Sequence, residues 1–94
     1  MSQESILHAI RAERERQDAK FGEQNHPMVY WLGILMEEVG EVAKDIIENR
    51  PTHEVEIEIV QVAAVAVALI ECIQRNKPLY ALDSMVTSAK EPQP

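Results

Sequence analysis

The chain has 94 residues, of which 46% are hydrophobic and 27% charged, with a formal net charge of −7 and an isoelectric point near 4.8. This length predicts a single domain, residues 1–94, whose own core is small relative to its surface. The acidic balance excludes a protein that holds a nucleic acid polymer through its phosphates, because such binding needs a basic face. A lone cysteine, Cys72, excludes an internal disulfide and favours a reducing, cytoplasmic location.

Three long helices and one short helix are predicted in chain order. The segments between turn signals are rich in Ala, Leu, Glu, Lys and Ile and lack the period-two alternation of strands. Helices are expected over residues 4–20, 28–48, 53–75 and 79–89, before a frayed tail at residues 90–94. Thr52 is the predicted N-cap of the third helix. The most hydrophobic stretch, residues 59–73, is shorter than the roughly 20 residues that span a bilayer, so no membrane association is expected.

The second predicted helix carries an apolar stripe with alternating spacings of three and four residues. Its members are Leu32, Leu35, Val39, Val42 and Ile46. Such a stripe is typical of the inner face of a helix in a bundle. The sequence therefore predicts an all-α, antiparallel helical bundle, and the short chain suggests that oligomerisation completes its core.

A second stripe on the same helix is polar at one end. It comprises Trp31, Ile34, Glu38, Glu41 and Asp45, and the third helix carries Glu54, Glu58, Gln61, Val65 and Ala68 at matching spacings. If the two helices fold back about the turn at residues 49–52, Glu38 lies level with Gln61, and Trp31 lies level with Ala68. The hairpin is thus predicted to have an apolar end and an acidic end.

The clustered carboxylates allow two interpretations. Like charges three or four residues apart destabilise a helix by roughly 0.2–0.5 kcal/mol per pair, so the cluster is either fully exposed to water or holds a cation. Carboxylate and amide oxygens are hard ligands that favour Mg²⁺ or Mn²⁺ over zinc. The alternating charges at residues 11–16 of the first helix are interpreted as solvent-exposed salt bridges.

The acidic residues also carry a family resemblance. EEVGE at residues 37–41, followed by EIVQ at residues 58–61, resembles the E-E-x-x-E … E-x-x-D signature of MazG-like, all-α nucleoside triphosphate pyrophosphohydrolases. ERERQDAKFGEQNHP at residues 13–27 and IVQVAAVAVA at residues 59–68 look like segments of the small, phage-type members. One position departs from the family pattern, because Gln61 stands where the signature has Asp and brings an oxygen without a charge.

The resemblance implies an activity and a set of ligands. The activity is Mg²⁺-dependent hydrolysis of a (deoxy)nucleoside triphosphate to the monophosphate and pyrophosphate, as in the house-cleaning of non-standard nucleotides, by a homodimer or homotetramer. The implied ligands of Mg²⁺ (or Mn²⁺) are Glu38, Glu41 and Glu58. Either Gln61 joins them as a weak ligand, or Glu54, one turn earlier, compensates. Glu38 or Glu41 would act on the attacking water as the catalytic residue.

Candidate substrate contacts come from the loop after the first helix and from the second helix. The resemblance favours a substrate role for Lys20, Phe21, Gln24 and Asn25. Lys44 joins Lys20 as a cationic candidate for the pyrophosphate end. Trp31, about 10 Å along the helix from Glu38, either stacks on the base or packs against Ala68.

Two other hypotheses remain open alongside the enzyme. One is a helical interaction module that pairs with a second copy or a partner while its acids are merely solvated. The other is a nucleotide sensor that binds without turnover. A stabilising response to Mg²⁺ separates the first alternative from the enzyme, because a ligand that binds only the native state raises its stability.

Overall fold

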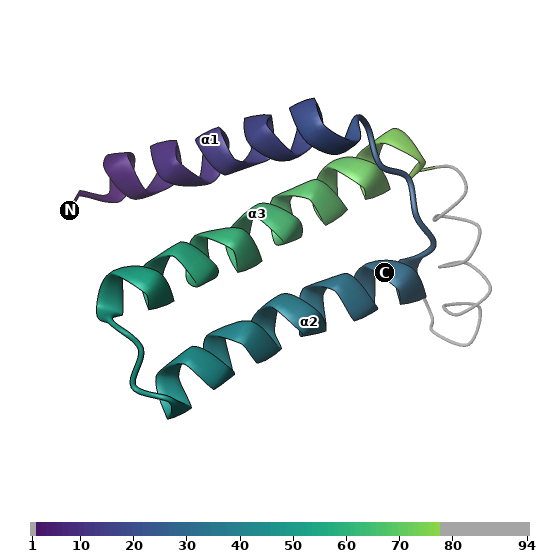
Figure 1. The fold of residues 1–94 in the computed structure, drawn as a ribbon. Helices are drawn as coiled ribbons and strands as arrows, with labels where there is room; N and C mark the ends of the chain where they lie inside the picture. Colours follow the sequence, from purple (N-terminus) through teal and green to yellow (C-terminus); the bar gives the residue numbers. More distant parts are fainter. Residues whose placement is uncertain (1, 78–94) are drawn as a thin grey trace, which may run out of the picture.

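The computed structural model describes residues 2–77, which form three helices and contain no strand. They are α1 (Gln3–Phe21), α2 (Met28–Ile47) and α3 (Thr52–Arg75). Helix α3 lies in the middle, with α1 along one side and α2 along the other, and α2 runs antiparallel to both (Figure 1). The prediction of an all-helical chain is confirmed for these residues. The predicted short helix at residues 79–89 and the tail at residues 90–94 lie outside the described range.

Local interactions fix both ends of α1. The Ser2 side chain accepts a hydrogen bond from the Ser5 backbone N–H at 3.1 Å, which is an N-cap of the usual kind. After Phe21, Gly22 adopts φ 70° and ψ −169°, a conformation nearly confined to glycine, and its N–H donates to the carbonyl of Asp18 at 2.8 Å. Gly22 therefore ends the helix and turns the chain toward α2.

The turn between α2 and α3 is closed by backbone hydrogen bonds. Asn49 takes a left-handed φ of 56°, its N–H donates to Ile46, and the N–H of Arg50 donates to Asp45 at 2.9 Å. This pair of bonds is the Schellman pattern of a helix C-terminus. The prediction of Thr52 as N-cap is wrong. Pro51 occupies that position, and its carbonyl accepts the first helical bond, so Thr52 is already the first residue of α3.

The core of the described chain is small, and its main cluster joins Trp31 of α2 to residues of α3. The buried apolar residues are Trp31, Ala64, Val65, Ala68 and Cys72, and α1 contributes none. Trp31 packs with Val65, Ala68 and Cys72, which confirms the predicted apolar end of the hairpin. Despite the apolar character of α3, no helix within residues 2–77 has both the length and the hydrophobicity needed to cross a membrane.

The side chains of the predicted inner face of α2 are only partly buried. Leu35 and Val42 are half-buried, whereas Leu32 and Ile46 are 56% and 57% exposed. The prediction fails because, among the three described helices, α2 packs against α3 alone, and the backbone of α1 does not approach it. The outward stripe of α2 forms a surface that we call the apolar outer face. Its large members are Leu32, Val39 and Ile46.

Candidate functional site

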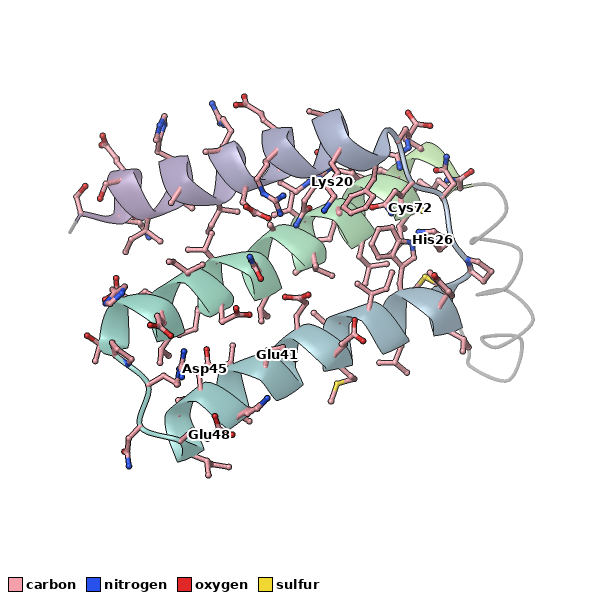
Figure 2. All side chains as sticks on the ribbon, viewed as in Figure 1. Lys20, His26, Glu41, Asp45, Glu48 and Cys72 are labelled. Carbon is pink, nitrogen blue, oxygen red and sulfur yellow. The ribbon has the colours of Figure 1, made fainter. Side chains whose placement is uncertain are left out.

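The acidic end of the hairpin brings polar side chains of α2 and α3 together. Glu41 and Asp45 lie on the side of α2 that faces α3 (Figure 2). The environment of Gln61 fixes the orientation of its amide. Only with its nitrogen toward α2 does it donate to Glu38 Oε2, at 3.1 Å, and to Glu58 Oε2, at 3.3 Å. The contact between Glu38 and Gln61 confirms the predicted register of the two helices.

The two carboxylates that meet Gln61 have perturbed acidities. Burial raises the pKa of Glu38, and the negative charges of neighbouring carboxylates, Glu58 first among them, raise it further. Burial also raises the pKa of Glu58, together with the charges of Asp45 and Glu41. The charged forms of both groups are therefore disfavoured in the folded chain, and positive charge placed between them would relieve that cost.

A cavity of about 300 Å³, here called the acidic cavity, opens between α1 and the α2–α3 hairpin. Its walls include six of the predicted site residues: Lys20, Phe21, Gln24, Trp31, Glu38 and Gln61. Lys20 Nζ stands 5.0 Å from the centre of the Phe21 ring, a cation–π contact. The cavity thus joins a cation and an aromatic ring at one end to a carboxylate and an amide at the other.

Other predicted residues lie beside this cavity or away from it. Glu41 and Glu58 adjoin Glu38 electrostatically but are not part of the cavity wall. Lys44 is exposed on α2 and does not line the cavity. Asn25 holds the loop to the end of α3, since its Oδ1 accepts from Asn76 Nδ2 at 2.8 Å.

Trp31 adopts the core-packing alternative that the sequence left open. It is 2% exposed and packs against Ala68, so its faces are covered by protein within the described chain. His26 meets it edge-on, with 5.0 Å between ring centroids. Trp31 nevertheless borders the acidic cavity and also a second, larger cavity on α1 and α3.

Helix α1 supplies site residues that sequence reasoning missed. The interpretation of residues 11–16 as fully solvated salt bridges is wrong for Glu13 and Arg14, whose side chains are 13% and 12% exposed. Glu13 lines the acidic cavity, and a hydrogen bond from Arg16 lowers its pKa. The signal was available in the spacing, because Ile10, Glu13 and Gln17 lie three and four residues apart on one helical face.

Comparison of the chain with models of protein families, with characterised proteins and with solved structures finds no match.

The donor set of the acidic end fits a hard divalent cation. Glu38, Glu41, Glu58 and Gln61 offer only oxygen ligands, which Mg²⁺ and Mn²⁺ prefer. Within residues 2–77 no three acidic, histidine or cysteine side chains already stand close enough to enclose an ion. The Gln61 amide nitrogen lies between Glu38 and Glu58 and donates a hydrogen bond to each. To ligate a metal, Gln61 would turn its oxygen inward.

Proposed function

We propose that this chain is a MazG-like, Mg²⁺-dependent nucleoside triphosphate pyrophosphohydrolase. It would cleave a (deoxy)nucleoside triphosphate, non-standard nucleotides included, to the monophosphate and pyrophosphate in the cytoplasm. One observation supports the proposal above all. Predicted site residues come from two separate stretches of sequence, residues 20–24 and residues 31–61, and six of these residues line one cavity.

The side chains in and beside the acidic cavity have different proposed roles in the reaction. Mg²⁺, or Mn²⁺ in its place, held by oxygens of the acidic end, would neutralise the charge of the polyphosphate. Among the described residues, two carboxylates line the cavity wall, Glu38 and Glu13; Glu13 is paired with Arg16, so Glu38 is the one proposed to take a proton from the attacking water. The water oxygen bonds to the α-phosphorus, and the bond from that phosphorus to the bridging oxygen breaks, so pyrophosphate leaves. Lys20 offers positive charge to that leaving group, and the exposed ring of Phe21 offers a stacking surface.

A second copy of the chain is the proposed partner at the apolar outer face. Full burial of a side chain such as Leu32 or Ile46 is worth about 1.5–3 kcal/mol, and both stand more than half exposed in the single chain. This face lies on α2, which packs against α3, so two copies meeting along α2 would form a core of four helices. A homodimer, or a tetramer built from two dimers, follows.

The exposed apolar surface also supports a second candidate, a helical interaction module without catalysis. In that case the same face would pair while the carboxylates bind nothing. Gln61, which lacks the negative charge of the family's Asp, favours the related alternative of a sensor that binds nucleotide without turnover. The three hypotheses differ in their response to Mg²⁺ and to nucleotide.

Pyrophosphate release tests the proposal directly. The full chain is assayed with Mg²⁺ against a panel of common and non-standard nucleoside triphosphates. At least one nucleotide is expected to yield pyrophosphate and the matching monophosphate, and Glu38→Gln is expected to abolish this release. Glu48→Gln is the matched control, because Glu48 is exposed just after the last residue of α2 (Figure 2), and the substitution should leave the rate unchanged.

Mg²⁺-dependent stability separates the remaining alternatives. An enzyme or a sensor gains thermal stability from Mg²⁺ with nucleotide, whereas an interaction module does not. Stabilisation without pyrophosphate release from any nucleotide would favour the sensor and overturn the proposed hydrolysis. If Mg²⁺ and nucleotide produce neither stabilisation nor pyrophosphate release, the interaction module is the remaining hypothesis.

A further inference from the structure

An ion pair on α1 belongs to the lining of the acidic cavity. Arg16 Nε donates to Glu13 Oε1 at 2.9 Å, and Arg16 Nη2 donates to Glu13 Oε2 at 2.5 Å, so the contact is bidentate. Both side chains line the acidic cavity together with Lys20 and Glu38. The proposed reaction uses Lys20 and Glu38 and gives Arg16 no role.

Glu13 determines where the Arg16 guanidinium lies. The Glu13 side chain is 13% exposed, whereas the Arg16 side chain is 54% exposed. Gln17 Nε2 also donates to Glu13 Oε2 at 3.3 Å, so the carboxylate is held by two neighbours on the same helix. The guanidinium is bound to a carboxylate in the cavity wall and is itself half exposed. It therefore lies at the edge of the acidic cavity, accessible to a ligand that enters it.

The ion pair leaves hydrogen-bond donors of Arg16 unused. A guanidinium carries five N–H groups in a fixed plane, and Glu13 takes one from Nε and one from Nη2. Within residues 2–77, Nη1 makes no hydrogen bond. The edge formed by Nη1 and the second N–H of Nη2 remains available, and it has the spacing that two oxygens of a phosphate group accept.

Lys20 lies on the same side of α1 as Arg16. The two residues are four positions apart, so they are neighbours on the helix surface, about 6 Å apart along the axis. Lys20 Nζ stands 5.0 Å from the centre of the Phe21 ring. A polyphosphate is an extended chain of anionic groups, so one that meets Lys20 also comes within reach of Arg16.

The pair borders a further cavity, of about 530 Å³, between the first half of α1 and the start of α3. Apart from Glu13 and Arg16, its described lining residues are Ala9, Ala12, His53, Glu56, Ile57 and Val60. These residues offer an anion no lysine or second arginine, and they add the negative charge of Glu56. A polyphosphate is therefore better placed on the side of Arg16 that faces the acidic cavity.

We propose that Arg16 is a further substrate-binding residue, whose unused edge donates two hydrogen bonds to the polyphosphate while Glu13 holds the other edge. The inference rests on the proposed function for the place of the polyphosphate. The ion pair as a whole has no net charge. Arg16 would thus act through N–H groups held in a fixed direction and not through long-range attraction.

Inorganic tripolyphosphate is the probe of this contact. Calorimetric titration of the full chain in Mg²⁺ measures its affinity, which Arg16→Gln should weaken about tenfold through the loss of charged hydrogen bonds. Arg11→Gln is the matched control. It also removes one positive charge from an exposed position on α1, but Arg11 does not line the acidic cavity, so the affinity should stay unchanged.

A second variant tests the shape of the donor group. Arg16→Lys keeps the positive charge and can still pair with Glu13, but an ammonium cannot present two parallel N–H groups to a phosphate. It is expected to recover only part of the affinity that Arg16→Gln loses. Circular dichroism checks the fold of each variant. If Arg16→Gln does not fold, Arg16→Lys decides, with an expected severalfold loss.

Several results would overturn the inference. They are the absence of tripolyphosphate binding, an affinity unchanged in folded Arg16→Gln, full wild-type affinity in Arg16→Lys, and an equal loss in Arg11→Gln. If the wild-type chain releases pyrophosphate and Arg16→Gln keeps the same kcat/KM, the role of Arg16 is rejected and the proposed function stands. If tripolyphosphate binds through Arg16 but no nucleotide is hydrolysed, the proposed hydrolysis is rejected and Arg16 stands as a phosphate ligand.

Discussion

At the scale of single residues, the charged forms of Glu38 and Glu58 are the electrostatically unfavourable groups of the site. Burial and neighbouring carboxylates raise the pKa of both groups above the ordinary value of 4.5. A group whose pKa is higher in the folded chain than in the unfolded chain holds its proton more tightly when folded. Its stabilising contribution is therefore complete below pH 4.5 and is lost as the pH rises through the folded-state pKa. Without a cation, the acidic end destabilises the chain at neutral pH.

Glu38→Gln should therefore stabilise the metal-free chain at pH 7. The substitution removes a charge and keeps the shape, and relief of a few tenths to about 1 kcal/mol raises the Tm by up to about 6 °C. The gain should disappear below pH 4.5, where the wild-type carboxyl is protonated as well. Thermal melts in EDTA from acidic to neutral pH measure this. A gain that does not depend on pH would contradict the electrostatic cause.

Gln61→Asp should have the opposite effect on the metal-free chain. A third negative charge would replace the amide that now donates to Glu38 and Glu58, so the Tm in EDTA should fall. With Mg²⁺ present, the added charged ligand should raise both the metal affinity and pyrophosphate release severalfold. Thermal melts with and without Mg²⁺ are recorded for Gln61→Asp and for the control variant Gln74→Asp, which changes an exposed position on the same helix. Equal Mg²⁺ responses in the two variants would argue against a ligand at Gln61.

At the scale of helices, the glycines give a matched contrast. An added Cβ at Gly22 meets no atom within 4 Å, so the cost of Gly22→Ala comes from the backbone conformation alone, at about 1–3 kcal/mol. Gly33→Ala and Gly40→Ala, inside α2 and equally unobstructed, should each stabilise by about 0.5–1 kcal/mol. Urea unfolding measures all three. Tolerance of Gly22→Ala would mean that α1 does not end in the conformation described.

The sequence predicted the helices closely because their ends are fixed locally. Gly22 and Pro51 act through their own backbone preferences, so the predicted bounds lie within about two residues of the observed ones, the usual uncertainty of helix ends. The inward side of α2 was harder to predict, because it depends on how many helices surround it. Within residues 2–77, α2 packs against α3 and not against α1, so the stripe led by Trp31 turns inward and the stripe led by Leu32 stays outside.

The candidate site shows the same division between local and tertiary information. The short turn after α2 fixes the register, so the meeting of Glu38 and Gln61 followed from sequence spacing. The contribution of α1 to the site did not follow from sequence spacing. The position of Glu13 beside Glu38 depends on how α1 docks against α3. The spacing of Ile10, Glu13 and Gln17 indicated an inward face, but charge alternation suggested full solvation.

At the scale of the whole molecule, the apolar outer face predicts self-association. The full chain should sediment as a dimer or tetramer, and Leu32→Glu should shift it to monomer, because a charge in an apolar helix contact cannot be solvated. Leu7→Glu is the control, since Leu7 is equally exposed but lies on α1, outside this face. Analytical ultracentrifugation makes the comparison. A wild-type chain that is monomeric at high concentration would reject the dimer.

The central claim is that α2 and α3 together present their oxygens to one divalent ion. Paramagnetic broadening by Mn²⁺ in ¹⁵N-labelled protein tests it most directly, because broadening falls off steeply with distance from the ion. At low Mn²⁺ occupancy, the amides near Glu38 and Glu41 on α2 and near Glu58 and Gln61 on α3 should broaden first, and excess Mg²⁺ should restore them. Broadening confined to one helix, or spread evenly over all the exposed carboxylates, would contradict a shared metal site.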